Sequence, residues 1–516
     1  MGKAIGNYGV KILFLLCISF VAFEAYMNGA DGKANKFILV FVIAVSLAVL
    51  ILTKFWVRRY QLFFEKHFVK ILTGYLLILF VVQIACGIHI RYQPMWDLDA
   101  VYGGAVSWLE NGNIDAYKDY FYYFPNNLGL LVFFRAYFGL LSLFFGNEMD
   151  YFIAAVVIGS IMLTVFRFSV IWIAKGLLGT EYGIVMMVLL LFCLPLYFAA
   201  AVFYTDVMSM AAPPLVYLLY LYSKGEDSWK GRILLYAEMA LIAAIGMEIK
   251  FTVIIIVIAI GIEMLLQGEW KKCLCMAAVH ILIICAVFTA VDGVIYSKLL
   301  DREQAEVQNT PYLHWVMMGA KGDGRYDGDD YNFTRQYTDR EEQQEALKTE
   351  IARRYTELGF DGVMELWKAK TIKCFGDGTY ALSDFLDDSP QNDTSWNDWL
   401  LYSGKNYDEY RTLCLGVFVT VMLLMLFSVV GSLGHRRGRR ANLPALWLAF
   451  FGVWFFLMFW ESSARYFMNM LSVMLVAAAA GLPHIEKWLK RVLLRVKASW
   501  RNEIWHAAVF SSCHKG

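Results

Sequence analysis

Two carboxylates stand close together just after an apolar segment. Residues 91–127 are polar, aromatic and acidic, and Asp97 and Asp99 lie near their start, shortly after the apolar segment that ends at Ile90. A carboxylate so near a bilayer costs free energy unless it is solvated, so its presence there suggests a function. Such a side chain can act as a general base that takes a proton from an incoming hydroxyl. Both aspartates are therefore candidate catalytic residues.

The residues after the two aspartates predict a short amphipathic helix over 100–110 that ends at Asn111–Gly112. Lying in the plane of the membrane surface, this helix would hold the aspartates toward water. Two structural alternatives stay open, in which Asp99 caps the helix and Asp97 has no role beyond structure. The apolar positions that recur at helical spacing are Tyr102, Ala105, Val106 and Leu109.

The composition indicates a membrane protein. The chain has 516 residues, 59% of them hydrophobic and only 18% charged. Apolar runs of about 18 or more residues recur along it, and each is long enough to cross a bilayer as a helix. Most of the nine cysteines lie inside such runs, so neither a disulfide framework nor a thiolate metal site is expected. The predicted fold class is an all-α polytopic membrane protein.

Basic residues orient the predicted spans. Lys54, Arg58 and Arg59 place the loop before residue 70 in the cytoplasm, and the HRRGRR sequence at 435–440 marks a second cytoplasmic loop. We expect about twelve spans with both termini inside and with the aspartate loop outside. The expected spans are 8–27, 37–57, 70–90, 151–174, 184–203, 207–223, 233–249, 251–267, 272–295, 411–433, 443–460 and 465–482.

One apolar run conflicts with this topology. Residues 127–145 are long enough to cross, but a crossing there would put every later basic loop on the wrong side. A juxtamembrane or re-entrant helix on the outer face removes the conflict. Arg135 in its middle and its many aromatic residues also suit an interfacial position.

These spans divide the chain into five parts. We expect an N-terminal hairpin with a cytoplasmic loop (1–69), a transmembrane module with the external loop 91–127 (70–295), an external soluble α-rich insertion (296–410), C-terminal spans (411–482) and a basic amphipathic tail (483–516). In the tail, 485–500 is expected to be a helix resting on the anionic inner leaflet. Its apolar face would carry Ile485, Trp488, Leu489, Val492, Val496 and Trp500.

The insertion is expected to begin with a Gly- and Asp-rich loop. A charged helix is predicted over about 338–358, followed by a second short helix with Lys368 and Lys370. The acidic residues of the loop lack the spacing of a calcium-binding loop, so a solvated loop is the preferred interpretation. These acidic residues are Asp323, Asp327, Asp329 and Asp330.

Several polar groups are expected to converge on the outer face. External carboxylates beside external cations suit the transfer of a group from a lipid-linked phosphate donor, since one carboxylate deprotonates the acceptor while cations hold the departing phosphate. The alternatives are snorkelling at helix ends for Lys250 and Arg465, and a turn or helix cap for Asp206. The converging residues are Asp97, Asp99, Asn126, Asn127, Asp206, Lys250, Glu461 and Arg465.

Seven sequence stretches together resemble the GT-C superfamily of integral-membrane glycosyltransferases, of the family-39-like kind related to protein O-mannosyltransferases and lipid A aminoarabinose transferase. The resemblance covers the whole chain. It is carried by the order of the motifs, each of which is weak alone. The motifs are PMWDLDAVYGGAVSWLENG, YFYYFPNNLGLL, FYTD (203–206), GMEIKFT (246–252), ARYF (464–467), HWVMMGAKGDGRYDGDDYN and KCFGDGTY (373–380).

The resemblance implies a polyprenyl-phosphate or dolichyl-phosphate sugar donor and an inverting transfer outside the cytoplasm. It implies that Asp97 is the catalytic base, with Asp99 beside it, and that Lys250 and Arg465 bind the donor phosphate. The chain departs from the family in an extra N-terminal hairpin and in FPNN, where relatives acting on lipid A have Lys-Pro; Arg135 is the candidate replacement. The candidate substrate-binding residues are Tyr102, Asn126, Asn127, Asp206, Glu461 and His314.

The expected partners are the polyprenyl-phosphate sugar, a cell-envelope acceptor (glycan, lipid or protein) and the lipid bilayer of a bacterial plasma membrane, with no nucleic acid. Two other functions stay open. A transporter or flippase for a lipid-linked sugar would place its charges near the bilayer midplane and often shows repeated halves. A polysaccharide polymerase or ligase would use the same donor chemistry. No dedicated metal site is indicated, and participation of Mg²⁺ or Mn²⁺ is left open.

Overall fold

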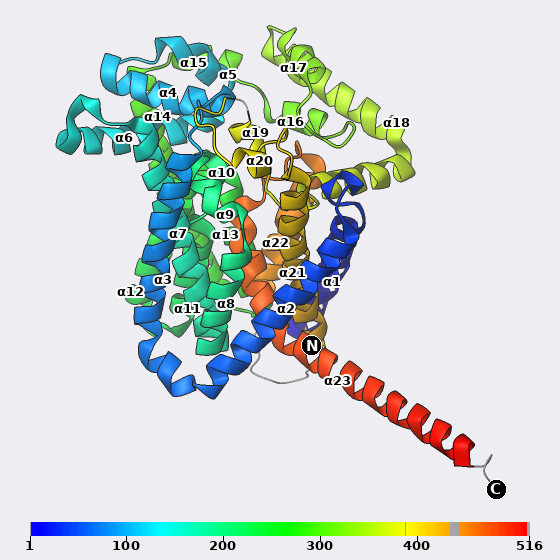
Figure 1. Cartoon of the computed structure of the whole chain (residues 1–516). Coiled ribbons are helices and arrows are strands. Elements are labelled where there is room, and N and C mark those ends of the chain that lie inside the picture. The colour runs from blue at the N-terminus through cyan, green and yellow to red at the C-terminus, as the bar shows by residue number, and fades with distance from the viewer. Residues whose placement is uncertain (1, 388, 434–442, 513–516) are drawn as a thin grey trace.

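The structure is a computed structural model that describes residues 2–387, 389–433 and 443–512. These residues form α-helices and short 3-10 helices, and the described part of the chain contains no strand beyond a single bridge between Tyr92 and Pro390. The long helices run up and down in one bundle, and the insertion covers one end of it (Figure 1). That end, which also carries α4 (Trp96–Asn111) and α6 (Leu128–Phe145), is called the insertion end below.

Successive bundle helices alternate in direction (Figure 1). Short connections join most of them, whereas residues 90–150 and 299–406 form the two long connections. This order follows the predicted spans closely. The bundle helices are α1 (Gly2–Asn28), α2 (Lys36–Arg59), α3 (Gln61–His89), α7 (Tyr151–Leu178), α8 (Thr180–Phe192), α11 (Ala212–Gly225), α12 (Trp229–Ile249), α13 (Ile254–Leu266), α14 (Trp270–Lys298), α21 (Tyr407–Leu433), α22 (Pro444–Phe459) and α23 (Leu471–Ser512).

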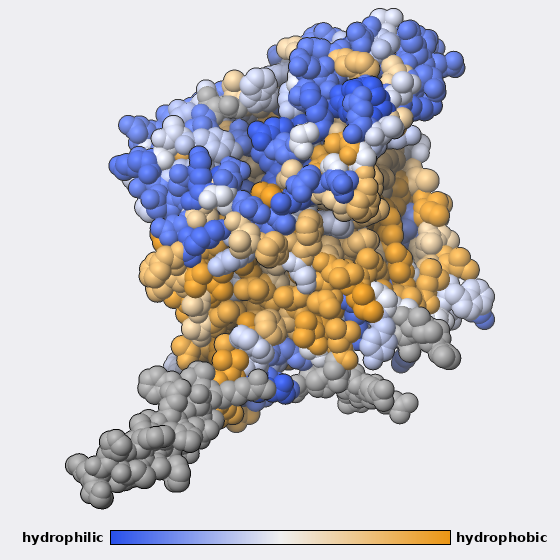
Figure 2. Space-filling model, turned by 90° about the vertical axis from the view of Figure 1, so that its right-hand side faces the viewer, coloured by the Kyte–Doolittle hydropathy of each residue, from blue (hydrophilic) through white to orange (hydrophobic). Residues whose placement is uncertain are grey.

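The surface of the bundle suits a bilayer. Figure 2 shows, on the face turned to the viewer, a broad hydrophobic band over the bundle and a hydrophilic cap above it. Eight helices within the described residues are long and apolar enough to cross a membrane, and a bent pair of helices brings the number to nine. Two shorter apolar helices, Phe251–Leu266 and Pro444–Phe459, lie among them. The chain is an integral membrane protein by these features, whereas the expected number of twelve spans stays a prediction.

Two predicted spans are interrupted. The span expected over 184–203 breaks after α8, and the following turn of helix, α9 (Pro195–Phe198) with η5 (Ala199–Ala201), is bent by 78° from it. Pro195 cannot continue the hydrogen-bonding of the helix before it. The span expected over 207–223 begins only at Ala212, after the short helix α10 (Thr205–Met208). Both breaks place irregular chain at the insertion end of the bundle.

At this end, α4 (Trp96–Asn111), α5 (Lys118–Tyr123) and α6 (Leu128–Phe145) form a separate layer. α4 ends as predicted, with Gly112 in the left-handed conformation at its C-terminus. α6 lies across the end of the bundle against α4 instead of running alongside the long helices (Figure 1). By length and composition alone, 125–145 also qualifies as a span. Its juxtamembrane position in a bilayer therefore stays a prediction.

The insertion is helical, as expected, and its two predicted helices are present. α18 (Arg340–Phe375) consists of two helices that meet at Gly359, whose backbone is non-helical with a φ of +59°. Glycine takes this conformation without a steric penalty, so the chain bends there before the second helix, which carries Lys368 and Lys370. The other helices of the insertion are α15 (Arg302–Gln308), α16 (Tyr312–Met318), α17 (Gly328–Arg335), α19 (Ser383–Leu386) and α20 (Asn397–Leu400).

The basic tail also differs from the prediction. The expected helix 485–500 is the continuation of α23, which begins at Leu471 and extends away from the bundle (Figure 1). Ile485 is buried, and the Trp488 ring packs 5.8 Å from that of Phe427, so the start of the tail belongs to the bundle. The side chains of Val496 and Trp500, and the HRRGRR sequence at 435–440, lie outside the described residues.

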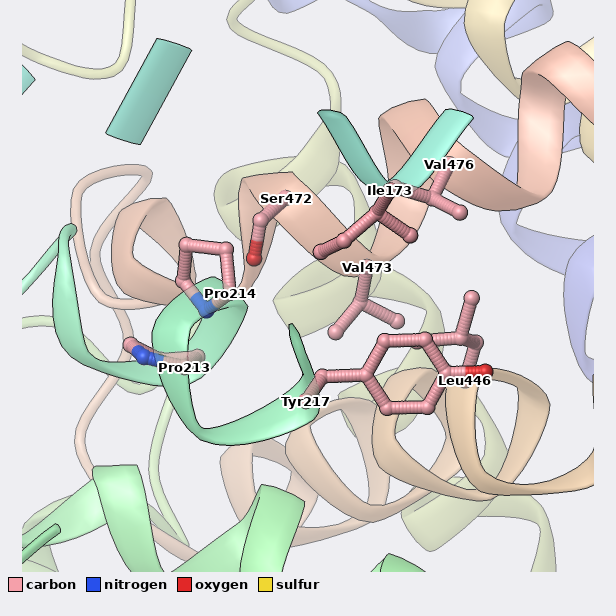
Figure 3. A pocket seen from close by; sticks show the side chains of 8 residues that line it. All are labelled: Ile173, Pro213, Pro214, Tyr217, Leu446, Ser472, Val473 and Val476. Carbon is pink, nitrogen blue, oxygen red and sulfur yellow. The ribbon is translucent and has the colours of Figure 1, made fainter. Parts of the chain in front are cut away.

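A narrow apolar gap lies inside the bundle between α7, α11, α22 and α23 (Figure 3). Its lining contains two prolines and several aliphatic side chains, with Ser472 and Tyr217 as the polar members. No charged side chain lines it, so it offers nothing for the chemistry considered above. The lining residues are Ile173, Pro213, Pro214, Tyr217, Leu446, Ser472, Val473 and Val476.

Candidate functional site

α4 places Asp97 at the insertion end of the bundle. The helix begins at Trp96, its N-cap is Met95, and no side chain caps it. The alternative in which Asp99 caps this helix is therefore wrong, because Asp99 lies inside the first turn. Trp96 has a φ of +55°, which is strained for a residue with a side chain. Both aspartates lie in the first turn, where the helix dipole favours negative charge.

Two tyrosines hold the carboxylate of Asp97. The Tyr120 hydroxyl donates to Asp97 Oδ1 at 2.9 Å, and the Tyr204 hydroxyl lies 3.2 Å from Asp97 Oδ2. Asn127 completes the group, because its Nδ2 donates to the Tyr120 hydroxyl at 2.5 Å and its Oδ1 lies 3.1 Å from the Tyr204 hydroxyl. We call Asp97, Tyr120, Asn127 and Tyr204 the carboxylate network. It fixes the direction of the Asp97 carboxylate, which stays half-exposed.

Two cations converge on one buried carboxylate nearby. Asp206 is 2% exposed and forms ion pairs with Lys250 and, at 3.1 Å, with Arg465 Nη1. The side chains of Lys250 and Arg465 are only 14% and 17% exposed, so the snorkelling alternative does not describe them. Nor does Asp206 cap a helix, because the N-cap of α10 is Tyr204. We call Asp206, Lys250 and Arg465 the cation cluster.

Aromatic rings join the two groups. The Arg465 guanidinium lies 5.3 Å from the ring of Tyr204, which belongs to the carboxylate network, and 5.0 Å from the ring of Tyr466. Lys250 Nζ lies 4.8 Å from the Tyr466 ring. A cation over an aromatic face is attracted by the ring quadrupole, more strongly where water is excluded. Tyr204 and Tyr466 therefore hold the two cations beside the network of Asp97.

Glu461 is a second acid next to these cations. Its carboxylate accepts a hydrogen bond from the Tyr466 hydroxyl at 2.9 Å, and the residue is 8% exposed. Burial raises the pKa of Glu461, and the nearby charge of Arg465 only partly opposes this effect. The proximity of Asp97 raises the pKa further. Glu461 thus favours the protonated form more than an exposed glutamate does.

The KCFGDGTY stretch supports the loop that carries Arg465. Phe375 stacks on Phe467 at 4.7 Å between ring centroids, and Tyr380 packs edge-on against the same ring. Asp377 accepts hydrogen bonds from the backbone N–H groups of Thr379 and Ala381, which closes the turn. Arg411 of α21 pairs with Asp377 at 2.9 Å and anchors the turn to the bundle. This motif is therefore a support for the site.

The insertion rests on the same loop. Lys370 is fully buried and donates to the backbone oxygens of Gly319 and Trp460, at 2.7 and 2.6 Å. Burial lowers the pKa of Lys370 to about 8. The Ser462 N–H donates to the Gly324 oxygen at 2.7 Å. The loop 319–324 of the insertion is thus fastened to residues 460–462, directly before Arg465 in the chain.

Three predicted site residues lie beside the network without joining it. Asp99 is half-buried, and burial raises the pKa of its carboxyl. Tyr102 packs against Phe138 and Phe203, with its centroid 6.1 and 5.5 Å from theirs. Asn126 is exposed.

Arg135 and His314 lie elsewhere. Arg135, expected to bind phosphate, sits 5.6 Å from the ring of Trp108 in the layer of α4 and α6. His314 is fully buried in the insertion, with its Nδ1 2.7 Å from Thr334 Oγ1. Burial lowers the pKa of His314 to about 4. Neither residue has a contact with the carboxylate network or the cation cluster among those recorded for the described residues.

Sequence reasoning missed the tyrosines that build the site. Tyr120, Tyr204 and Tyr466 each lie in a stretch already singled out, namely YFYYF, FYTD and ARYF. The available signal was a tyrosine close to a charged residue in two of these stretches, Asp206 in FYTD and Arg465 in ARYF. Tyrosine is common at membrane boundaries for packing reasons, so composition alone could not assign it to the site.

The acidic residues of the insertion are engaged by protein groups. Arg354 pairs with Asp330 at 2.6 Å, and Asp327 pairs with Lys321 at 2.8 Å while capping α17. Asp323 pairs with Arg325 at 2.5 Å. Across the described residues, no group of three or more His, Cys, Asp and Glu side chains could hold a metal ion.

Comparison with known proteins identifies the family to which the chain belongs. No curated protein matches the chain, and no solved structure matches it. One family model matches residues 9–484, which span the bundle and both charged groups of the site. The chain therefore belongs to the family described as conserved hypothetical integral membrane protein.

Proposed function

We propose that the protein is a glycosyltransferase that moves a monosaccharide from a polyprenyl-phosphate donor to a hydroxyl group of a cell-envelope acceptor. One observation carries the proposal. Asp97, a carboxylate held by two tyrosines and still open to solvent, lies beside two buried cations at one end of a membrane bundle. The GT-C-like order of the sequence motifs agrees with this arrangement.

The groups divide the reaction between them. The acceptor oxygen attacks the anomeric carbon as the bond from that carbon to the phosphate oxygen breaks, which inverts the configuration. The hydroxyl proton passes to Asp97 as general base. The negative charge that develops on the departing polyprenyl phosphate is stabilised by Lys250 and Arg465, which are pre-positioned by Asp206. The low exposure of both cations strengthens this interaction relative to water.

The proposal includes the orientation in the membrane. Turns at the end opposite the insertion carry Lys54, Lys175 and Lys224 close to the helix ends, which favours the cytoplasm for that end. The insertion and the site then face outward, with twelve spans and with α6 at the outer surface of a bacterial plasma membrane. Both ends of α6 should be accessible from outside, so Asn126→Cys and Glu148→Cys should react with an impermeant thiol reagent in intact cells. Reaction of Glu148→Cys from the cytoplasm alone would show that α6 crosses.

A transporter of a lipid-linked sugar is the second candidate, and one observation favours it. The break between α8 and α9 lies beside Arg167, which is fully buried in α7. Broken helices and buried charges within spans are typical of transporters. However, Arg167 Nη2 donates to the Leu196 oxygen at 3.1 Å and Gln83 Nε2 donates to the same oxygen. These bonds satisfy a carbonyl freed by the break, which is a structural task.

Turnover of a donor separates the two functions. Purified protein in lipid nanodiscs, given polyprenyl-phosphate monosaccharides and a cell-envelope extract, should release polyprenyl phosphate and form a sugar product. A transporter would move the donor across a liposome membrane and leave its glycosidic bond intact. Movement of intact donor without bond cleavage would refute the glycosyltransferase.

A further inference from the structure

The second of the two helices in α18 packs its C-terminal half against the last two turns of α22. Thr371 is fully buried, and its Oγ1 accepts the indole N–H of Trp454 at 3.1 Å. The Trp367 ring packs edge-on against three rings of α22, those of Trp454, Phe455 and Phe459, with centroids 5.9, 6.3 and 5.5 Å away. This helix is therefore fixed at the insertion end of an apolar bundle helix.

One face of this helix continues beyond α22 as an apolar stripe. Phe360, Met364 and Trp367 stand at i, i+4 and i+7, and Thr371 follows one turn later, so all four share one face. The exposed fraction rises along this face, from a buried Thr371 and a half-buried Trp367 to 39% for Met364 and 77% for Phe360. We call Phe360, Met364 and Trp367 the α18 stripe. The polar residues on the adjacent side of the helix are Asp361, Glu365 and Lys368.

The α18 stripe lies at the edge of the hydrophobic band. Phe455 is 43% exposed beside Trp367, so the stripe joins a side of α22 that faces away from the bundle core. α22 has 16 residues and is about 24 Å long, shorter than the hydrocarbon core of a bilayer, which is about 30 Å thick. A helix packed on its last turns therefore lies at the boundary of the hydrocarbon. Figure 1 shows α18 turning back to the bundle beside α1, and Figure 2 shows this side of the molecule, where the hydrophobic band reaches up to the cap.

We propose that Phe360 and Met364 insert into the lipid leaflet at the insertion end, so that the second helix of α18 is an interfacial helix that anchors the insertion to the bilayer. An amphipathic helix in the plane of the interface buries its apolar face about 5–10 Å into the boundary of headgroups and acyl chains. Contact with lipid removes from water the apolar area that both side chains expose. The inference does not depend on the proposed function.

A protein partner fits this surface less well than lipid does. A stable protein interface buries about 800 Å² on each partner. The exposed part of the stripe consists of two side chains, and a phenylalanine contributes at most about 250 Å². Continuity with the exposed ring of Phe455 instead indicates the solvent that surrounds the bundle helices, which is lipid.

The membrane contact also bears on the candidate site, because the same helix carries Lys370. The Lys370 amine donates to the oxygens of Gly319 and Trp460 and so fastens the insertion to the loop before Arg465. The leaflet thereby holds the helix from which this loop is fastened.

Fluorescence quenching on the full-length protein tests the anchor. A fluorescent amino acid replaces Phe360, and the protein is placed in nanodiscs of phosphatidylethanolamine and phosphatidylglycerol. Lipids with a doxyl group near the headgroup end of the acyl chain should lower the fluorescence about twofold, whereas iodide in the water should have little effect. The matched control carries the same amino acid at Glu365, whose side chain is 77% exposed on the polar side of the helix. There iodide should quench and doxyl lipid should not.

Hydrogen exchange tests the anchor without a label. Phe360→Asp should speed exchange of the amides over 360–368 in nanodiscs about tenfold, because the contact with lipid is lost. Phe360→Leu, which keeps an apolar side chain, should exchange like the wild type. Phe360 makes little contact with protein, so a purely structural role predicts no change in either variant. Folding of each variant is checked by its unfolding temperature.

Four results would overturn the anchor. Quenching of the label at position 360 by iodide would place it in water, and quenching by neither reagent would show that a second copy or another protein covers it. Equal quenching by doxyl lipid at positions 360 and 365 would contradict the assignment of one face to the membrane. Exchange in Phe360→Asp at the rate of the wild type would show that no contact depends on the ring.

Discussion

Glu263 and Asp206 are buried carboxylates that each pair with a lysine, at opposite ends of the bundle, and their surroundings differ. Glu263 of α13 accepts from Tyr220, Lys224 and Gln267 on one oxygen, while its other oxygen accepts the Ala445 N–H at 2.9 Å. Donors from α11, from α22 and from the C-cap of its own helix thus saturate it. One of them is the first turn of α22, whose free N–H groups need such a partner.

At Asp206, by contrast, positive charges outnumber the carboxylate. It meets two cations, and among the described residues neither Lys250 nor Arg465 has a second carboxylate within ion-pair distance. The remaining partners recorded for these cations are aromatic faces, which leave N–H groups available for an anion. A buried charge is expensive unless it is paired or used. Glu263 therefore joins helices, whereas the excess of cations around Asp206 suits the phosphate of the proposed donor.

The largest expected effect comes from replacing Glu263, the carboxylate whose oxygens are saturated by donors. Glu263→Ala should lower the free energy of unfolding by about 3–5 kcal/mol, because buried Tyr220 and the Ala445 N–H lose their acceptor together. Thermal unfolding in detergent measures the loss. The folded fraction should bind polyprenyl phosphate with unchanged affinity. An unfolding temperature equal to that of the wild type would show that Glu263 does not join these helices.

The second effect distinguishes the lysine paired with Asp206 from the lysine paired with Glu263 by their contributions to donor binding. Lys250→Met should weaken binding of a polyprenyl-phosphate sugar by about 10- to 150-fold, because a charge-assisted contact to the phosphate is lost. Lys224→Met, which removes the lysine paired with Glu263, is the matched control and should leave donor affinity unchanged. Binding is measured by surface plasmon resonance on nanodiscs. Equal affinities in both variants would return Lys250 to a structural role.

The third effect concerns His314, a buried titratable group of the insertion that, in the described part of the chain, contacts neither Glu263 nor Asp206. Its pKa is about 4 in the folded protein against an ordinary value near 6.5, because burial disfavours the charged form. Between these values the unfolded chain binds the proton and the folded chain does not, so stability falls as pH drops from about 6.5 to about 4. The loss from this group should reach about 1–3 kcal/mol.

His314→Leu should remove that part of the pH dependence, which unfolding measured across pH 4–7 would reveal. Donor turnover near neutral pH should change little in this variant, since His314 contacts Thr334 within the insertion. A variant with the pH dependence of the wild type, or one without turnover, would contradict the structural role given to His314 here.

The smallest expected effect distinguishes the two aspartates of α4. Asp99→Asn should lower donor turnover by less than about tenfold, because Asp99 lies outside the carboxylate network and caps no helix. Turnover is followed as release of polyprenyl phosphate. An inactive Asp99→Asn protein together with an active Asp97→Asn protein would transfer the role of base to Asp99.

Much of the architecture could be predicted because hydropathy and basic loops act locally. The predicted spans correspond to helices of the bundle, and the end of α4 at Gly112 follows from a residue that takes the left-handed conformation freely. The break after Phe192 was missed although Pro195 marked it, because the surrounding run is uniformly apolar. The two helices predicted within 338–370 correspond to the two parts of α18, which the non-helical Gly359 separates.

The site could be predicted only in part, for a physical reason. The sequence placed Asp97, Asp206, Lys250, Glu461 and Arg465 on one face because each stands at the end of an apolar run. It could not show which of them touch, since their contacts join distant parts of the chain, with Asp206 separated by 44 residues from Lys250 and by 259 from Arg465. Arg135 was chosen by its place in an apolar run, whereas packing on Trp108 decides where its guanidinium lies.

Replacement of Asp97 tests the central claim most directly. Asp97→Asn keeps the shape of the side chain and can still accept hydrogen bonds from Tyr120 or Tyr204, but it cannot take a proton. Release of polyprenyl phosphate by the purified variant in nanodiscs should fall about 10²- to 10⁴-fold, with unchanged donor affinity and unfolding temperature. Turnover equal to that of the wild type would contradict the assignment of Asp97 as the base and, with an equally active Asp99→Asn, the glycosyltransferase itself.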